Sequence, residues 1–184
     1  MAKYVGALDQ GTTSNRFIIF DHGGQIVAAD QKEHEQIFPQ PGWVEHNPLE
    51  IWQNTQDVIR GALAKANLSG SDLAAIGITN QRETSVAWER ASGRPLGPAI
   101  SWQCQRTDPA CRALREGGHE GLVRQRTGLT IAPMFSATKM RWLLDAIEVG
   151  VAGRVGPGDG GTGGGVDGRV VPGVPLESGV ESSW

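Results

Sequence analysis

The chain has 184 residues, of which 39% are hydrophobic and 20% are charged, as in a soluble globular protein of about one domain. A net charge of −3 without a basic tail argues against nucleic acid or an anionic membrane as a partner. The N-terminus lacks the pattern of a signal peptide and no apolar run is long enough to span a membrane, so we expect a cytoplasmic protein. The two cysteines have no CxxC spacing and are expected to be reduced, structural thiols.

Three extended segments are predicted at the start of the chain, at residues 4–9, 16–21 and 25–31. The sequence GTTS separates the first two, and the sequence HGG forms a hairpin turn between the second and the third. The polar stretch EQIFPQPGWVEHNP then follows as an ordered loop. We expect Phe38 and Trp43 to anchor this loop by packing against the body of the protein.

A helix is predicted from residue 48 to about residue 67. Asn47 suits the N-cap, Pro48 the first helical position, and Glu50 the third position of a capping box. Apolar and small residues recur at helical spacing on the face that we expect to be buried: Ile51, Trp52, Thr55, Val58, Ile59, Ala62, Leu63 and Ala66.

Strands and helices alternate after this helix. A buried strand is predicted at residues 74–79, and further extended segments at 83–88 and 99–102. Helices are predicted at residues 108–117 and from Ser136 onwards, with Ser136 as the cap of the last helix. Strands first, and then helix alternating with strand, predict an α/β fold whose sheet has an antiparallel hairpin at one edge.

This pattern ends near residue 149. Twelve of the 35 residues from 150 to 184 are glycine, and no helical or alternating period remains. Such a composition cannot bury enough apolar surface to order itself, so we divide the chain into a domain at 1–149 and an irregular glycine-rich tail at 150–184. We favour a shifted reading frame over a flexible linker as the origin of the tail, because valine and arginine among the glycines are unlike Gly/Ser linkers.

The turn after the first strand carries one acid and several hydroxyl groups. Gly11 lets the chain approach a phosphate closely, and the N–H groups and hydroxyls of Thr12 and Thr13 can donate to it. Asp9 can hold Mg²⁺ directly or through its waters, and Arg16 adds a fixed positive charge. An ordinary hairpin turn is the competing interpretation, because the sequence has neither a P-loop lysine nor GxGxxG.

A second polar cluster follows the strand predicted at 74–79, in the position where open α/β sheets bind their ligands. Arg82 and Glu83 can donate to and accept from a pair of hydroxyl groups, as a small polyol requires. The indole face of Trp102 can line the C–H side of such a ligand. A surface ion pair and a core tryptophan are the alternatives. The four histidines show no metal-ligand spacing and are expected to be structural or exposed.

Five motifs together resemble the N-terminal part of the glycerol kinases, a family of carbohydrate kinases in the actin and Hsp70 ATPase superfamily. They are DQGTTSNR, PGWVEHNPLEIW, AIGITNQRET, WQCQRT and FSATKMRWLLD, and they occur in order between residues 4 and 147. The resemblance implies an incomplete RNase H-like (actin-like ATPase) domain and transfer of the γ-phosphoryl group of ATP to glycerol. Related sugar kinases such as xylulokinases typically differ at the segments matching WVEHNP and TNQRE, which favours glycerol.

The resemblance also implies roles for the residues of the first turn. Thr12, Thr13, Ser14 and Arg16 match the residues around the ATP phosphates. Asp9 matches the acid near the Mg²⁺ ion.

Four further residues match the glycerol pocket of the family. Arg82 and Glu83 match the pair that binds glycerol, and Trp102 matches an aromatic wall of the pocket. Met134 stands where the family usually has the tyrosine of Asp-Pro-Tyr, so a hydroxyl donor is replaced by a thioether that cannot donate a hydrogen bond.

The general-base aspartate of the family, its adenine pocket and its second domain would lie beyond the start of the tail, so we assign no catalytic base. We expect the parent enzyme to phosphorylate glycerol with ATP and Mg²⁺, and this chain itself to be inactive. A non-catalytic fragment that binds a polyol or phosphate, and a related sugar kinase, are the alternatives. The full-length enzyme can form a homo-oligomer.

Overall fold

The computed structural model describes residues 3–148 and 180–182, so most of the predicted tail lies outside the described residues. The described chain divides into two compact units, each of which is treated by itself. Unit 1 comprises residues 3–37 and 46–82, and unit 2 comprises residues 38–45, 83–148 and 180–182.

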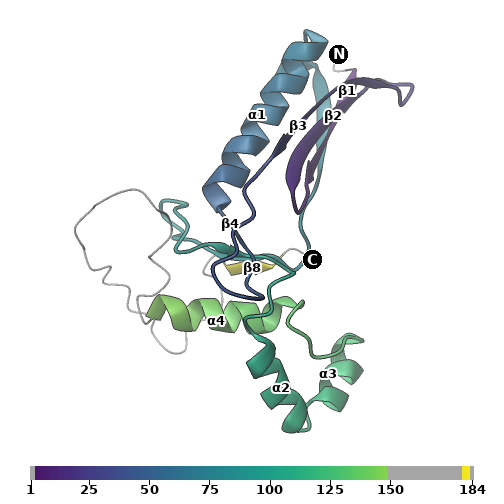
Figure 1. Ribbon diagram of the computed structural model, residues 1–184. Coiled ribbons are helices and arrows are strands. Elements are labelled where there is room, and N and C mark those ends of the chain that lie inside the picture. The colour runs from purple at the N-terminus through teal and green to yellow at the C-terminus, as the bar shows by residue number, and fades with distance from the viewer. Residues whose placement is uncertain (1–2, 149–179, 183–184) are drawn as a thin grey trace, which may run out of the picture. The chain divides into compact units, whose positions relative to one another are not determined.

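Unit 1 is a four-stranded mixed sheet with a long helix along one face (Figure 1). Its strands, in spatial order β3-β2-β1-β5, are β3 (Ile26–Glu33), β2 (Ser14–Phe20), β1 (Tyr4–Gln10) and β5 (Leu73–Thr79). β2 runs antiparallel to both β1 and β3, whereas β5 runs parallel to β1. The helix α1 (Pro48–Ala66) and a short 3₁₀ turn, η1 (Gly70–Asp72), connect the hairpin to β5. The predicted α/β order with an antiparallel hairpin at one edge is confirmed.

The predicted ends of α1 are confirmed. The side chain of Asn47 accepts hydrogen bonds from the N–H groups of Leu49 at 3.0 Å and Glu50 at 3.4 Å. Asn67 ends the helix in the left-handed conformation, with φ 52°. The capping box predicted at Glu50 is wrong, because the carboxylate of Glu50 accepts the N–H of Glu35 at 3.2 Å instead.

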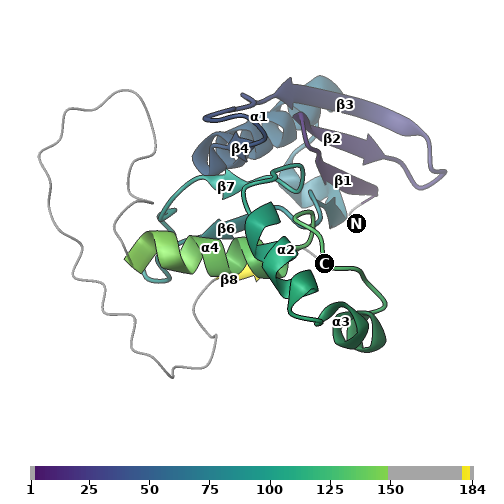
Figure 2. The same cartoon turned by 60° about the horizontal axis from the view of Figure 1, so that its bottom comes forward.

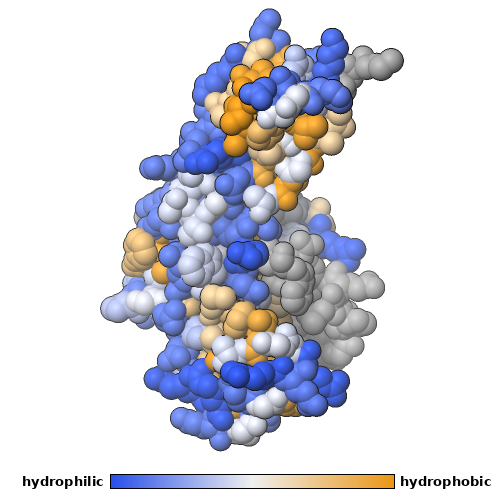
Figure 3. All heavy atoms as spheres, turned by 90° about the vertical axis from the view of Figure 1, so that its right-hand side faces the viewer, coloured by the Kyte–Doolittle hydropathy of each residue, from blue (hydrophilic) through white to orange (hydrophobic). Residues whose placement is uncertain are grey.

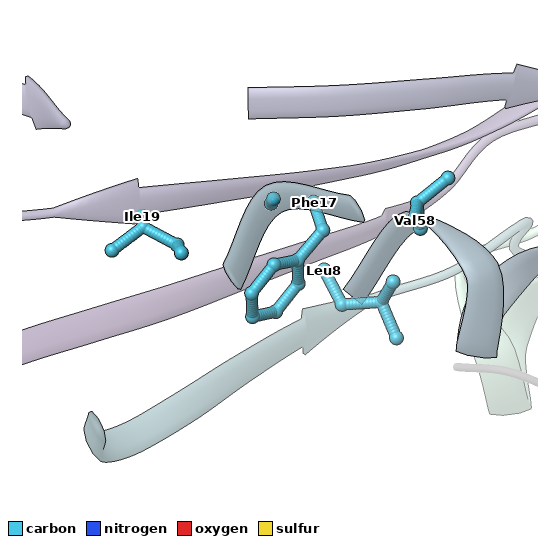
Figure 4. Packing of buried hydrophobic residues seen from close by; sticks show 5 residues of the cluster. Leu8, Phe17, Ile19 and Val58 are labelled. Carbon is cyan, nitrogen blue, oxygen red and sulfur yellow. The ribbon is translucent and has the colours of Figure 1, made fainter. Parts of the chain in front are cut away.

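The core of unit 1 lies between α1 and the sheet. Leu8, Phe17 and Ile19 from the strands meet Val58 and Ala62 from the helix, and all five are buried. Figure 4 shows the ring of Phe17 beside Leu8, and Val58 of α1 in the same cluster.

One residue of the predicted buried face of α1 lies outside it. The buried face is formed by Asn54, Thr55, Val58 and Ala62. Trp52 is 60% exposed.

The prediction of a buried strand at residues 74–79 is wrong. Ile76 is 46% exposed and Ile78 is 68% exposed. In the described part of the chain β5 pairs with β1 alone, while α1 packs over β1, β2 and β3, so β5 is an edge strand. Apolar side chains are visible at the surface in Figure 3. An uncharged edge strand of this kind can pair with another chain.

Unit 2 combines a small sheet with three helices (Figure 2). The second sheet has the strand order β4-β7-β6-β8, with β4 (Glu45–His46), β7 (Ala99–Ile100), β6 (Ser85–Ala87) and β8 (Val180–Ser182). The helices are α2 (Asp108–Glu116), α3 (Glu120–Thr127) and α4 (Ser136–Glu148). α3 was not predicted from the sequence, because almost all of its residues are exposed and show no apolar period.

A buried guanidinium group lies at the centre of unit 2. The side chain of Arg106 is 0% exposed and lies 3.9 Å from the ring centre of Trp43 and 4.6 Å from that of Trp142. It donates to the carboxylate of Glu45 at 2.6 Å and, through Nε, to the sulfur of Cys104 at 3.0 Å. Segments far apart in the sequence are therefore joined through one side chain.

The loop before β4 is anchored by one of its two predicted aromatic residues. Trp43 packs against Arg106, as predicted for an anchor of the loop. Phe38 is 67% exposed, so the prediction that it packs against the body of the protein is wrong. Cys104 and Cys111 are buried free thiols, as predicted. No helix in the described residues is both long and apolar enough to cross a membrane.

Gly6 allows the closest packing in the core of unit 1, because a Cβ at this position would lie 2.3 Å from Cζ of Phe17. We expect Gly6→Ala to lower the free energy of unfolding by about 1–3 kcal/mol, since the ring must move to make room. Gly77→Ala is the matched control on β5, because a Cβ there meets no atom within 4 Å. Urea denaturation followed by circular dichroism measures both, and equal stabilities would contradict the packing of Phe17 against Gly6.

Candidate functional site

The predicted phosphate-binding residues lie at the turn between β1 and β2. The N–H of Gly11 donates to the carbonyl of Ser14 at 2.9 Å and closes the turn. A Cβ on Gly11 would lie 2.9 Å from the same oxygen, so a larger residue does not fit there. Asp9 and Arg16 are register partners at the base of the turn. The hairpin thus brings together Asp9 and Arg16, which lie seven positions apart in the sequence.

The charged residues of this turn lie on the face of the sheet opposite α1, because they alternate with the buried residues Leu8 and Phe17. Arg16 donates through Nε to Gln31 at 3.0 Å, and the amide of Gln31 donates to the hydroxyl of Ser14 at 3.0 Å. Asp9 is exposed and forms no ion pair with the described residues. Gln31 was not predicted from the sequence, since only the register of β2 and β3 places it beside Arg16.

Buried polar side chains hold the turn from the opposite face. The amide of Asn15 and the amide of Gln10 each donate to the hydroxyl of Thr55 in α1 at 2.9 Å. Asn15 and Thr55 are both buried, so the bond between them forms in an environment without competing water, whereas the bond from Gln10 is partly buried. The side chain of Gln36 also donates to the carbonyl of Thr12 at 3.1 Å. The turn is therefore tied to the helix and to the loop that follows β3.

Two buried histidines, His34 and His46, lie next to each other, and one of them contacts the turn between β1 and β2. The rings of His34 and His46 are perpendicular, with their centroids 5.0 Å apart, and the N–H of His34 donates to the carbonyl of Thr13 at 3.2 Å. Burial lowers the pKa of His46 to about 4; the neighbouring His34 acts in the same direction and the backbone of Glu35 opposes it. Burial also lowers the pKa of His34. No group of three or more metal-binding side chains is found among the described residues.

Glu83 is the best-defined residue of the predicted polyol site. Its φ is 66°, in the left-handed region that non-glycine residues seldom occupy, and such strain is often found at functional sites. Its Oε2 atom accepts the N–H of Ser136 at 2.8 Å and the hydroxyl of Ser136 at 2.5 Å. Ser136 is the first residue of α4, so the carboxylate of Glu83 caps the helix in place of the predicted serine cap.

Trp102 and Met134 are connected to Glu83 through neighbouring residues of unit 2. Ser85 pairs with Ile100 across the antiparallel strands β6 and β7, so Glu83, which precedes β6, and Trp102, which follows β7, lie at the same end of this pair. The N–H of Trp102 donates to the hydroxyl of Thr84 at 3.2 Å. Met134 is 41% exposed and lies two residues before Ser136. The structure thus brings these three predicted residues into one region.

Arg82 differs from its neighbour in the sequence. It is exposed and belongs to unit 1, whereas Glu83 belongs to unit 2. Among the described residues the two side chains form no ion pair with each other. The roles of Arg82 and Glu83 stay predictions.

Lys139 and Ser136 are further residues whose contacts the sequence analysis missed. Both are buried, on the same face of α4 as Leu143 and Ala146. The sequence does hold a signal for Lys139, because a lysine within the apolar stripe of a helix is unusual and requires acceptors for its charge.

Three comparisons with known proteins agree on one family. Residues 4–151 match the N-terminal domain of the FGGY family of carbohydrate kinases. A glycerol kinase of Chloroflexus aurantiacus is 58% identical over 147 residues, which cover 80% of this chain and 30% of that protein. The crystal structure of Plasmodium falciparum glycerol kinase with ADP is 30% identical, with a TM-score of 0.72, over 79% of this chain and 30% of that one.

The fold is shared more widely than the sequence. The crystal structure of xylulose kinase from Rhodospirillum rubrum is 25% identical, with a TM-score of 0.72, over 81% of this chain and 30% of that one. These matches confirm the predicted actin-like ATPase fold. The chain spans about 30% of the length of the relatives that it matches.

The buried histidine pair predicts an acid-sensitive fold around the turn. Unfolded histidine takes up a proton near pH 6.5, whereas the folded form of His46 resists protonation down to about pH 4. Stability is therefore lost as the pH falls from 6.5 towards 4, by about 3 kcal/mol, since each pKa unit corresponds to about 1.4 kcal/mol. Urea denaturation at several pH values measures the loss.

His46→Gln, which removes the titrating group, should reduce this pH dependence. His22→Gln, at an exposed position, is the matched control and should leave it unchanged. The same pH dependence in both variants would show that His46 is not responsible.

Proposed function

The chain belongs to the FGGY family of carbohydrate kinases, and we propose that it carries the polyol-binding and phosphate-binding residues of an ATP-dependent glycerol kinase. The reaction transfers the γ-phosphoryl group of ATP to a terminal hydroxyl of glycerol and gives glycerol 3-phosphate and ADP. The observation that carries the proposal is the carboxylate of Glu83, which the N–H of Ser136 holds at the N-terminus of α4. The residue that follows it, Thr84, accepts the N–H of Trp102. The 58% identity to a glycerol kinase supports glycerol over a sugar as the acceptor.

Glu83 is suited to accept a hydrogen bond from a hydroxyl group of the polyol. Its Oε2 atom is occupied by Ser136, whereas Oε1 accepts no hydrogen bond from the described residues. The indole of Trp102 can cover the carbon backbone, and the resemblance to the family assigns Arg82 as a donor to the polyol. Donor, acceptor and apolar wall together are what a small polyol requires.

The turn at residues 11–14 is suited to the phosphate groups of ATP. Thr12 and Thr13 supply N–H groups and hydroxyls, Ser14 adds a further hydroxyl, and Arg16 supplies a positive charge. The bonds from Gln31 hold Ser14 and Arg16 on the open face of the sheet. Phosphoryl transfer depends mostly on such positioning and on stabilisation of charge.

Asp9 would hold Mg²⁺ in this proposal. No cluster of three or more metal-binding side chains is present in the described part of the chain, so the protein alone offers no complete cage. Mg²⁺ is commonly bound by one or two carboxylates together with phosphate oxygens and water, and an exposed carboxylate without an ion pair fits that role. When bound, the ion neutralises charge on the transferred phosphate.

The partners of this proposal are glycerol and ATP, and the cytoplasm is the expected location because it supplies ATP. Assembly into a homo-oligomer is a further proposal for the whole enzyme. The residues of the relatives outside the matched part are expected to supply the general base and the adenine pocket.

Replacement of Glu83 by glutamine should weaken the binding of glycerol. Loss of a charge-assisted hydrogen bond corresponds to about 1.5–3 kcal/mol, and the change is nearly isosteric. Glu116→Gln, at an exposed position on α2, is the matched control. Calorimetric titration with glycerol measures all three proteins, and equal affinities would show that Glu83 does not contact the polyol.

Replacement of Met134 by tyrosine should have the opposite effect. The hydroxyl adds a hydrogen-bond donor at a half-exposed position, so glycerol should bind more tightly. The same titration with xylulose tests the related sugar kinases as an alternative. Tighter binding of xylulose than of glycerol would favour that alternative.

The 184-residue chain alone should not phosphorylate glycerol. The loss of positioning groups can remove roughly 7–11 kcal/mol of catalytic advantage, which would leave turnover undetectable. A coupled assay for ADP measures this on protein purified from a host that lacks its own glycerol kinase. Release of ADP that depends on glycerol would contradict the prediction.

A further inference from the structure

Lys139 is a fully buried cation on the inner face of α4. Its relative exposure is 0%, and its neighbours on this face are Ser136, Leu143 and Ala146. A buried ammonium group is costly unless each of its hydrogens finds an acceptor. Lysine side chains are seldom buried without such partners. The hydrogen-bond acceptors around the ammonium group therefore indicate the role of Lys139.

The acceptors are three consecutive backbone carbonyls. Nζ of Lys139 donates to the oxygens of Pro133 at 2.9 Å, of Met134, and of Phe135 at 3.3 Å. An ammonium group has three hydrogens, so this set satisfies it completely. Carbonyl oxygens that converge on one point repel each other unless a cation lies between them. The shape of the turn before α4 therefore depends on the charge of Lys139.

This turn leads directly into the polyol site. Met134 belongs to it, and Ser136, the next residue but one, donates twice to Oε2 of Glu83. A displacement of the turn would move the N–H and the hydroxyl of Ser136 together. Glu83 would then lose the contacts that hold its strained backbone and direct its carboxylate.

We propose that Lys139 is a positioning residue of the polyol site: its ammonium group holds the carbonyls of residues 133–135 so that Ser136 fixes the carboxylate of Glu83. The inference deepens, and rests on, the function proposed above. Lys139 does not touch the polyol in this arrangement. It acts through the turn and through Ser136.

The charge state of Lys139 provides a way to test this role. Burial lowers the pKa of Lys139 to about 8, while the charge of Glu83 and the thiols of Cys104 and Cys111 act in the opposite direction. The ammonium form prevails at pH 7, and the neutral amine prevails at pH 9.5. A neutral amine has two hydrogens for three carbonyls, so the turn should loosen as the pH rises.

The first measurement is made on the 184-residue chain without ligand. Hydrogen exchange of the Ser136 amide, followed by NMR, reports its bond to Glu83. We expect Lys139→Met to speed this exchange at least tenfold at pH 7, whereas the amides of α2 keep their protection. Lys139→Arg, which retains a cation, should restore part of the protection. Arg141→Met removes an exposed cation from the same helix and should change nothing at Ser136.

The second measurement is calorimetric titration with glycerol. Lys139→Met should weaken binding about tenfold at pH 7, and affinity should fall between pH 7 and pH 9.5 in the original chain but not in this variant. Unchanged Ser136 protection together with glycerol affinity within twofold would overturn the inference. Failure of the original chain to bind glycerol would contradict the proposed function, whereas the exchange of Ser136 would still decide the role of Lys139.

A pH titration covers the case in which Lys139→Met does not fold. In the original chain, the chemical shift of the Ser136 amide should follow the titration of the Lys139 side chain, measured at its ε-carbon. A Ser136 amide that is insensitive to this titration would overturn the inference without any substitution.

Discussion

The buried guanidinium group of Arg106 is the interaction on which unit 2 depends. It lies between the indole rings of Trp43 and Trp142 and pairs with Glu45, so it joins the loop before β4, the segment before α2 and the helix α4. Removal of one partner from a buried ion pair costs about 3–5 kcal/mol, because the other charge is left without compensation. The three segments are therefore fixed relative to one another within unit 2. The position of α4 within unit 2, and of the groups at its N-terminus, follows from this constraint.

Unit 1 follows the same principle with neutral groups. Its apolar core of residues such as Leu8 and Phe17 provides stability, but apolar contacts alone tolerate small shifts of a helix along a sheet. The buried bond from Asn15 to Thr55 does not tolerate such shifts, because an unsatisfied buried amide costs about 1–3 kcal/mol, and the partly buried bond from Gln10 to Thr55 adds to it. These bonds fix the turn at residues 11–14 against α1. In both units, buried polar groups position the exposed residues to which we assign a function.

The residues assigned to ligand binding and the residues that orient them thus form two separate classes. Asp9, Arg16 and Met134 are accessible, as a binding residue must be, whereas Thr55, Lys139 and Arg106 are buried. Motifs in the sequence identify the first class because chemistry restricts which residue types can serve. The second class is less visible in a sequence, since many side chains can satisfy a buried group and their partners lie far away along the chain.

The sequence by itself determined the features that depend on neighbouring residues. Asn47, Pro48 and Asn67 set the ends of α1 because caps act within one turn of a helix, and the alternation of β1 and β2 around a glycine turn specified a hairpin. The motifs also identified the family and named the candidate site residues, whose individual roles stay predictions.

Only the tertiary structure decided which of these elements are covered and which side chains meet. The sequence of β5 predicts a buried strand, yet Ile78 is 68% exposed because α1 covers the other strands of its sheet. Gln31 meets Arg16 through strand register, and Lys139 meets the carbonyls before α4 through packing of that helix. Burial and hydrogen-bond partners depend on residues that are distant in the chain, and local sequence signals extend over only a few residues.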